Sequence, residues 1–415
     1  MKVAALQKID RYIGVPLCFG LTVFRKLFGR KTFSPPPLRR ILFVKLAEQG
    51  STVLAYSAIR VATEMVGREN VYVACFDDNR FILDALGLIP EENVVPITYS
   101  SPAVLTRSAG KALVRLQKLK LDAAIDMEFF ARGSAAFTLL TGAKLRVGFH
   151  AFFGAGPYRG DLFTHRLLYN PYLHTAQMFQ LLVEALRHPR EQLPTLPVPP
   201  PPLGEELPRF VAAPLEIEVV RELLASETGQ GELPPILLLN PNASDLLPLR
   251  RWEMQRYVQL ARRLLLKYPG AYVGFTGAPN EVEAAEALVK DVGSARCFSL
   301  AGKTTLRQLL IAYSLARVLV TNDSGPAHFA ALTAIQVVTL FGPETPRLFA
   351  APTPRNTPVW AGIACSPCVN AYNNRQTRCT NNLCMQQITV DQVFEEVCCA
   401  YDRSRADGRL GRSAA

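Results

Sequence analysis

The stretch Thr321-Asn-Asp-Ser-Gly-Pro-Ala-His328 is the most informative part of the sequence, because it follows the apolar run Val318-Leu-Val and precedes a short helical segment. A second apolar run, Gln336-Val-Val-Thr-Leu-Phe341, comes next. This order predicts two parallel strands joined through a loop and a helix, and ligands bind beyond the carboxyl ends of such strands. A helix beginning at Ser324 or Gly325 directs free N–H groups and a positive dipole end to that edge, which suits a phosphate. The alternative is a capped helix with a core histidine.

Short apolar runs alternate with helical stretches along most of the chain. In the first half, the expected strands are residues 41–46, 71–76, 94–97, 123–127 and 146–149, with helices over 52–65 and 103–120. In the second half, strands over 236–240 and 272–276 and helices over 252–268, 281–292 and 306–315 surround the quoted stretch. This alternation predicts an α/β fold with parallel strands and crossover helices.

A proline-rich stretch separates the two series. Residues 194–208 hold seven prolines, which favours a stiff extended linker over a helix or central strand. The expected organisation is therefore a basic amphipathic segment (1–40), a Rossmann-like domain (41–193), the linker (194–208), a second Rossmann-like domain (209–400) and a basic tail (401–415). Two α/β halves joined in this way are expected to form a cleft.

The positive charge is concentrated at the two ends of the chain. The net charge is +11, yet residues 1–40 carry nine Lys or Arg against Asp10 alone, and residues 401–415 carry four Arg against two Asp. A nucleic-acid-binding protein would normally carry basic residues over its body, so no nucleic-acid partner is expected. Basic ends beside apolar sequence favour an anionic membrane surface.

The N-terminal segment contains an apolar run of 12 residues from Ile13 to Phe24, with basic residues on both sides. About 20 apolar residues are needed to span a bilayer, and no small-residue cleavage pattern of a secretory signal follows. Pro16 and Gly20 weaken the run as a straight helix. We expect a cytoplasmic protein, peripheral on the inner face of the cytoplasmic membrane through this segment. An N-terminal helix packed on the body of the protein is the alternative.

Four of the nine cysteines form a spaced cluster near the C-terminus, Cys365-x2-Cys368-x10-Cys379-x4-Cys384. Four thiolates at such spacing can hold a structural zinc ion in tetrahedral geometry. A cysteine-containing loop without a ligand is the alternative, and no reaction step depends on the cluster.

An ordered set of motifs resembles the bacterial heptosyltransferases, glycosyltransferase family 9, which use ADP-heptose to build the lipopolysaccharide core. The first half contributes Ile41 to Leu54 and Thr141-Gly-Ala-Lys-Leu-Arg-Val-Gly-Phe149. The second half contributes Leu239-Asn-Pro-Asn-Ala-Ser244, Arg250-Arg-Trp252, Phe275-Thr-Gly-Ala278, Leu300-Ala-Gly302, Asp323-Ser-Gly-Pro-Ala-His328 and Leu340-Phe-Gly-Pro-Glu-Thr345. The resemblance covers about residues 40–400.

The resemblance implies a GT-B arrangement of two Rossmann-like domains facing a cleft, and an inverting, metal-independent sugar transfer that requires no cofactor. The C-terminal domain is expected to bind an ADP-sugar donor, and the N-terminal domain a lipid-linked glycan acceptor such as lipopolysaccharide core. A non-catalytic relative that senses a nucleotide-sugar or scaffolds an assembly is the alternative function. An epimerase is disfavoured, because the dinucleotide fingerprint Gly-x-Gly-x-x-Gly is missing after the first strand.

On the donor side, Arg250 occupies the position of the Lys in the family's Lys-x-Trp motif. Its planar guanidinium can bind two oxygens of a diphosphate and keeps its charge. The resemblance implies that Asp323 accepts hydrogen bonds from sugar hydroxyls. His328 lies one turn into the expected helix, where it either contacts phosphate or braces the loop. The remaining donor-binding candidates are Asn242, Ser244, and the backbone of Ser324 and Gly325 for the phosphates, and Glu281 for the ribose.

On the acceptor side, the chain departs from the family. The family's presumed catalytic base is an Asp directly after the loop glycine, and here that pair reads Gly50-Ser51. A serine cannot act as the base at neutral pH without help. Our hypothesis is that Glu48, in the same loop, is the base, with Asp126 and Glu128 as the next candidates. If no carboxylate serves, the chain is a relative with changed specificity or without activity.

Overall fold

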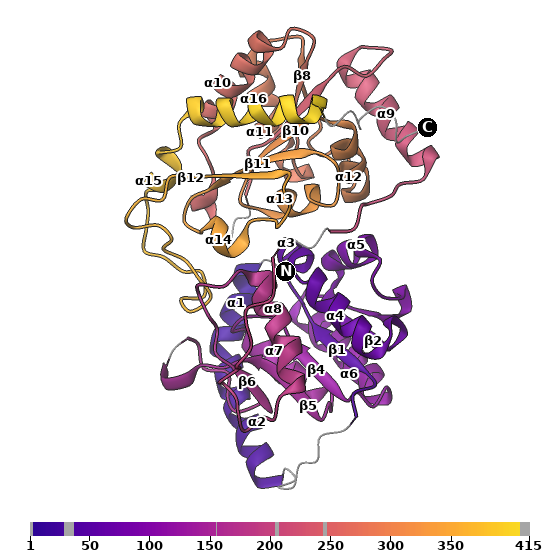
Figure 1. The fold of residues 1–415 in the computed structure, drawn as a ribbon, viewed down its shortest axis with the longest axis vertical. Coiled ribbons are helices and arrows are strands. Elements are labelled where there is room, and N and C mark those ends of the chain that lie inside the picture. Colours follow the sequence, from indigo (N-terminus) through magenta and orange to yellow (C-terminus); the bar gives the residue numbers. More distant parts are fainter. Residues whose placement is uncertain (1–2, 29–36, 155, 204–206, 244–246, 407–415) are drawn as a thin grey trace. The chain divides into compact units, whose positions relative to one another are not determined.

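The computed structural model describes residues 3–28, 37–154, 156–203, 207–243 and 247–406, and the chain divides into two α/β units (Figure 1). Unit 1 comprises residues 1–203 and 369–377, and unit 2 comprises residues 204–368 and 378–415. The division at Leu203 falls within the expected linker, whereas residues 369–377, expected in the second domain, belong to unit 1.

Unit 1 is built on a six-stranded parallel sheet with the strand order β3-β2-β1-β4-β5-β6. Its strands are β1 (Ile41–Val44), β2 (Val71–Phe76), β3 (Val94–Ile97), β4 (Ala123–Asp126), β5 (Leu145–Phe149) and β6 (His165–Leu167). Val44 is in register with both Ala74 and Asp126. The strand order reverses between β1 and β4, and such a switch point is where open α/β sheets bind ligands.

Helices cover both faces of this sheet, so β1 is buried on both sides. Ile41 and Phe43 belong to one hydrophobic cluster, and Leu42 and Val44 belong to the other, as expected for a parallel sheet. The helices are α3 (Gln49–Leu54), α4 (Tyr56–Val66), α5 (Asp77–Leu86), α6 (Pro102–Lys118), α7 (Arg132–Leu140) and α8 (Thr175–Glu184), with short 3-10 turns η1 (Arg68–Asn70), η2 (Glu91–Asn93), η3 (Phe152–Gly154) and η4 (Ala185–Arg187).

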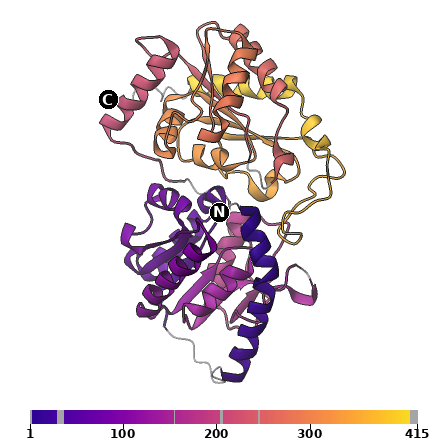
Figure 2. The same cartoon turned by 180° about the vertical axis from the view of Figure 1, so that it is seen from behind.

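The N-terminal segment forms two helices, α1 (Val3–Tyr12) and α2 (Gly14–Phe28), which run along one side of unit 1 (Figure 2). The Asp10 carboxylate accepts hydrogen bonds from the backbone N–H groups of Arg132 and Gly133 at the start of α7, both at 2.8 Å. Pro16 lies in the first turn of α2, where a helix tolerates proline. The segment is therefore docked on the body. Among the described residues, no helix is both long and apolar enough to cross a bilayer.

Unit 2 repeats the topology, with the strand order β12-β11-β10-β7-β8-β9 and a reversal between β7 and β10. Its strands are β7 (Ile236–Asn240), β8 (Tyr272–Phe275), β9 (Cys297–Ser299), β10 (Val318–Asn322), β11 (Gln336–Phe341) and β12 (Asn356–Trp360). Its helices are α9 (Pro214–Thr228), α10 (Met254–Lys267), α11 (Val282–Val292), α12 (Leu306–Leu315), α13 (Gly325–Ala330), α14 (Pro346–Phe349), α15 (Leu383–Gln386) and α16 (Val390–Ala406), with η5 (Pro248–Arg250) and η6 (Pro279–Glu281). Both units thus have the Rossmann strand order.

Candidate active site

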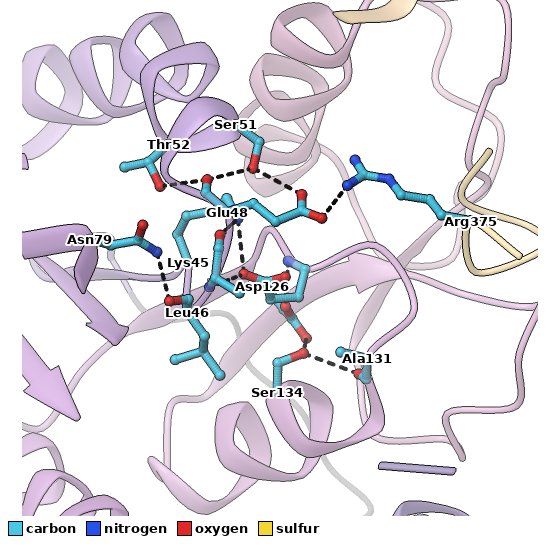
Figure 3. A network of polar contacts seen from close by, with 12 residues as sticks. Lys45, Leu46, Glu48, Ser51, Thr52, Asn79, Asp126, Ala131, Ser134 and Arg375 are labelled. Atoms are coloured by element: carbon cyan, nitrogen blue, oxygen red, sulfur yellow. Dashed lines mark hydrogen bonds and ion pairs between the residues drawn. The ribbon is translucent and has the colours of Figure 1, made fainter. Parts of the chain in front are cut away.

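In unit 1, the loop between β1 and α3 places Glu48 at the switch point of the sheet (Figure 3). Glu48 has a left-handed backbone, with φ 65° and ψ 83°, which is uncommon for a residue with a side chain. The Glu48 carbonyl accepts hydrogen bonds from the Ser51 hydroxyl at 3.0 Å and from the Thr52 N–H at 3.1 Å. The first turn of α3 therefore fixes the Glu48 backbone in this conformation.

The Glu48 carboxylate is held from two sides. Its Oε1 forms an ion pair with the Arg375 guanidinium, and its Oε2 lies 3.3 Å from the Ser51 hydroxyl. The Glu48 side chain is 31% exposed. An oriented carboxylate that solvent can reach has the properties that a general base needs.

Asp126, at the end of β4, is fully buried. Its carboxylate pairs with Arg159 and accepts hydrogen bonds from the Ser134 hydroxyl and the Glu128 N–H, both at 2.9 Å. Burial raises the pKa of the Asp126 carboxyl to about 6, although Arg159 acts in the opposite direction. Because no acceptor hydroxyl can reach a buried carboxylate, this geometry favours a structural role for Asp126.

Glu128 braces the loop that carries Glu48. One of its oxygens accepts hydrogen bonds from the buried Lys45 ammonium at 3.0 Å and from the Ala47 N–H at 2.9 Å. The side-chain amide of Asn79 adds a bond to the Leu46 carbonyl at 2.7 Å. Of the three carboxylates considered, Glu48 is thus the one whose geometry suits a base.

In unit 2, the loop after β10 brings Asp323 to the switch point, and α13 begins two residues later at Gly325 with Ser324 as its N-cap residue. The helix begins at Gly325, as the sequence indicates, but spans only six residues. His328 lies on this helix and is buried.

Arg250, at the end of η5, reaches this loop. Its guanidinium donates a hydrogen bond to the Asp323 carbonyl at 3.2 Å, pairs with a Glu344 oxygen at 2.9 Å and lies 3.7 Å from an Asp323 carboxylate oxygen. The Arg250 side chain is 13% exposed and that of Glu344 2%. The arginine is therefore ordered beside Asp323, and two carboxylates offset its charge.

The other donor-binding candidates either lie near Arg250 and Asp323 or form hydrogen bonds within their own turns. The Asn242 carbonyl accepts a hydrogen bond from the Asn322 side chain at 3.2 Å, so the loop after β7 is tied to the end of β10. Glu281 accepts a hydrogen bond from the Ala278 N–H at 2.6 Å, which closes its own turn. Ser244 lies outside the described residues.

Four residues that were not predicted from the sequence as site residues organise these two clusters. Asn322 is the last residue of β10, and Glu344 lies just beyond the end of β11. Polar residues at the carboxyl ends of parallel strands are a sequence signal for a binding site. Asn322 donates to the Pro241 carbonyl at 2.9 Å and accepts from the Trp252 N–H at 3.2 Å. Arg159 and Arg375 lie in irregular loops, and no sequence pattern marked them.

Of the four clustered cysteines, Cys365 and Cys379 are exposed and Cys368 is half-buried. Cys384 is buried, and burial raises the pKa of its thiol to about 11. Within the described ranges, no group of three or more His, Cys, Asp or Glu side chains could hold a metal ion. The zinc site at Cys365, Cys368, Cys379 and Cys384 stays a prediction.

Comparison with known proteins gives the family. The family model described as glycosyltransferase family 9 (heptosyltransferase) matches residues 110–378. Lipopolysaccharide heptosyltransferase 2 of Salmonella typhimurium is 32% identical over 129 residues, which is 30% of this chain and 36% of that protein. The Escherichia coli K12 protein of that name is 34% identical over 102 residues, 24% of this chain and 29% of its own. The alignments thus span less than two thirds of these relatives.

Solved structures of the same family share the fold. The structure of E. coli ADP-heptose lipopolysaccharide heptosyltransferase II has a TM-score of 0.66 at 19% identity, covering 88% of this chain and 99% of that one. E. coli heptosyltransferase WaaC with ADP has a TM-score of 0.61 at 17% identity, covering 87% and 99%. The expected α/β class with two Rossmann-like units is confirmed. With its family-model match, this chain belongs to glycosyltransferase family 9, the heptosyltransferases.

Proposed function

We propose that the protein is a glycosyltransferase that moves a sugar, heptose from ADP-heptose in the simplest case, to a lipid-linked acceptor such as lipopolysaccharide core. The transfer inverts the anomeric carbon and uses no metal. The observation that carries the proposal is the Glu48 carboxylate, held by Arg375 at the switch point of unit 1. A protein that only bound a nucleotide-sugar would have no need of an oriented base there.

The acceptor hydroxyl loses its proton to Glu48 as its oxygen attacks the anomeric carbon of the donor sugar. General base catalysis of this kind contributes about 10²–10⁴-fold to a rate. The C–O bond to the diphosphate breaks on the opposite face of the sugar, so ADP departs with the bonding electrons and the configuration inverts.

The departing diphosphate gains negative charge, which fixed donors stabilise best where water is excluded. We assign this task to Arg250 with the backbone N–H groups of Ser324 and Gly325. Since Arg250 contacts Glu344 at 2.9 Å, phosphate oxygens must compete with that carboxylate for the guanidinium. Further contacts are assigned to Asp323 for sugar hydroxyls, Glu281 for ribose, and Asn242, Ser244 and His328 for phosphate.

The outer face of α1 and α2 supports action at a membrane surface. Six large apolar residues on it are each 59–73% exposed: Tyr12, Ile13, Phe19, Phe24, Leu27 and Phe28. Large apolar residues that are exposed together in one segment are typical of interaction sites, and the basic residues of this segment favour anionic headgroups. We propose that this face lies on the inner leaflet of the cytoplasmic membrane, where a lipid-linked acceptor is presented.

The test is transfer of isotope-labelled heptose from ADP-heptose to heptose-deficient lipopolysaccharide by the full-length protein. Label appearing in the lipid fraction, together with release of ADP, supports the proposal. Saturable binding of ADP-heptose without any transfer would instead support the alternative, a non-catalytic relative that senses the nucleotide-sugar.

A further inference from the structure

The chain returns to unit 1 after β12 through residues 369–377, here called the return loop. Ala371 belongs to the hydrophobic core of unit 1, and the Tyr372 ring packs against Phe130 and Tyr169 with ring centroids 5.7 and 5.2 Å apart. The Tyr372 hydroxyl also donates a hydrogen bond to the Tyr169 carbonyl. These contacts anchor the return loop on unit 1.

The backbone of the return loop fixes where Arg375 begins. The side chains of Asn370 and Asn373 each accept a hydrogen bond from the other's backbone N–H, at 3.2 and 3.0 Å. Asn374 and Arg375 are both left-handed, with φ 52° and 53°, and the Arg375 N–H donates to the Asn370 carbonyl at 3.0 Å. Such conformations cost energy in residues with side chains, and they cluster at functional sites.

Arg375 and Glu48 meet across 327 positions of sequence. Their side chains are 22% and 31% exposed, and ion pairs this accessible contribute little to stability. Both partners are left-handed residues in loops that other contacts hold in shape. This combination indicates that the ion pair orients the Glu48 carboxylate and contributes little to the stability of the fold.

We infer that Arg375 is a positioning residue for the transfer reaction, which holds the Glu48 carboxylate in the direction from which it takes the acceptor proton. The inference rests on the proposed role of Glu48 as the base. The return loop follows all the strands of unit 2 in sequence. In this role it completes the acceptor site in unit 1.

The experiment measures kcat and KM for ADP-heptose, with heptose-deficient lipopolysaccharide as acceptor, in wild type, R375Q, R375K, E48Q and R375Q/E48Q. R378Q, which removes an exposed arginine three positions along, is the matched control. We expect R375Q to lower kcat at least tenfold with KM for ADP-heptose unchanged, R375K to recover most of the loss, and R378Q to behave as wild type. Melting temperatures identify any variant that fails to fold.

The double variant separates positioning from an independent contact. If Arg375 acts through Glu48, R375Q/E48Q turns over no more slowly than E48Q. Losses that multiply in the double variant, or a kcat of R375Q equal to that of wild type, overturn the inference while leaving the base assignment intact. Full activity of E48Q, or an inactive wild type, overturns the base or the proposed function itself, and the inference with it.

Discussion

In unit 1, the loop at the switch point carries a carboxylate held by an arginine, whereas in unit 2 the corresponding region carries an arginine held by two carboxylates. The strand order around the two loops is the same. Glu48 is 31% exposed, but Arg250 and its partner Glu344 are 13% and 2% exposed. One topology thus presents an accessible carboxylate in one unit and a largely buried arginine beside two carboxylates in the other.

This difference has consequences for chemistry and for stability. The Glu48 carboxylate pairs with Arg375 but remains partly exposed, so it can still take a proton. An arginine between two buried carboxylates is rigid, yet an incoming phosphate must displace part of its coordination. We therefore expect substitutions in unit 1 to affect turnover more than stability, and substitutions at Arg250 to affect both.

The largest expected effect is that of Glu48→Gln. Transfer should fall by about 10²–10⁴-fold, the usual contribution of a general base, while the affinity for ADP-heptose stays unchanged. Steady-state transfer rates and calorimetric titration measure the two quantities. Glu92→Gln, at an exposed position of unit 1, is the control. Turnover of the Glu48 variant within threefold of wild type would contradict the base assignment.

Ser51→Asp in the Glu48→Gln background sharpens the same point. The resemblance implies that an aspartate at this position is the base in other family members, and Ser51 already lies 3.3 Å from a Glu48 oxygen. The double variant should recover at least about tenfold of the lost transfer rate, because a carboxylate again reaches the acceptor. An unchanged rate would show that position 51 does not face the acceptor hydroxyl here.

Arg250→Ala should destabilise unit 2 by about 2–4 kcal/mol, because breaking a largely buried ion pair exposes the cost of burying its partner. Arg375→Ala should cost less than about 1 kcal/mol, as accessible pairs do. Urea unfolding followed by far-UV circular dichroism is the measurement, because it reports both units, whereas both tryptophans, Trp252 and Trp360, lie in unit 2. Equal shifts of the midpoint would contradict the contrast between the units.

Glu344→Gln should strengthen ADP binding a few-fold, by about 1 kcal/mol or less. The substitution removes one of the two negative charges that compete with phosphate for Arg250. Calorimetric titration with ADP measures the change, and Glu253→Gln, at an exposed position, is the matched control. Weaker binding would show that Glu344 orients Arg250 for the phosphates instead of competing with them.

The smallest effect is expected at the Arg307–Glu216 ion pair, a reference pair outside the Glu48 and Arg250 clusters. Two hydrogen bonds from Arg307, at 2.6 and 2.8 Å, and one from the Ala213 N–H lower the pKa of Glu216 to about 2. A lowered pKa contributes stability above the unfolded value, and this contribution is lost as pH falls toward 2. The difference in urea midpoint between wild type and Glu216→Gln should therefore shrink between pH 4.5 and 2. A difference that grows over this range would contradict the assignment.

The sequence predicted the central strands of both sheets because parallel strands buried on two faces are continuous apolar runs. Three edge strands went unpredicted: β6 and β9 have three residues each, and β12 contains Asn356, Thr357 and Pro358. A run so short or so polar has no period to detect, and only pairing with the neighbouring strand makes it a strand. The four-residue helix α14 likewise went unpredicted, because so short a helix depends on its surroundings.

The candidate site also has one part that the sequence predicts and one part that it does not. Arg250 and Asp323 lie together because the segment after β7 and the loop after β10 meet at the switch point, a position that motif and topology predict. The different environments of Asp126, Glu128 and Glu48 depend on side-chain partners such as Arg159 and Lys45, which no spacing reveals. Arg375 reaches Glu48 only through the shape of the return loop, 327 positions away.

The most direct test of the account is a crystal structure of the protein with an unreactive fluorinated ADP-heptose and heptose-deficient lipopolysaccharide oligosaccharide. If Glu48 is the base, the attacking hydroxyl oxygen lies within about 2.6–3.2 Å of a Glu48 carboxylate oxygen, the reach of a general base, with Arg375 still paired to that carboxylate. An acceptor hydroxyl bonded to another carboxylate, with Glu48 turned away from it, would contradict the account.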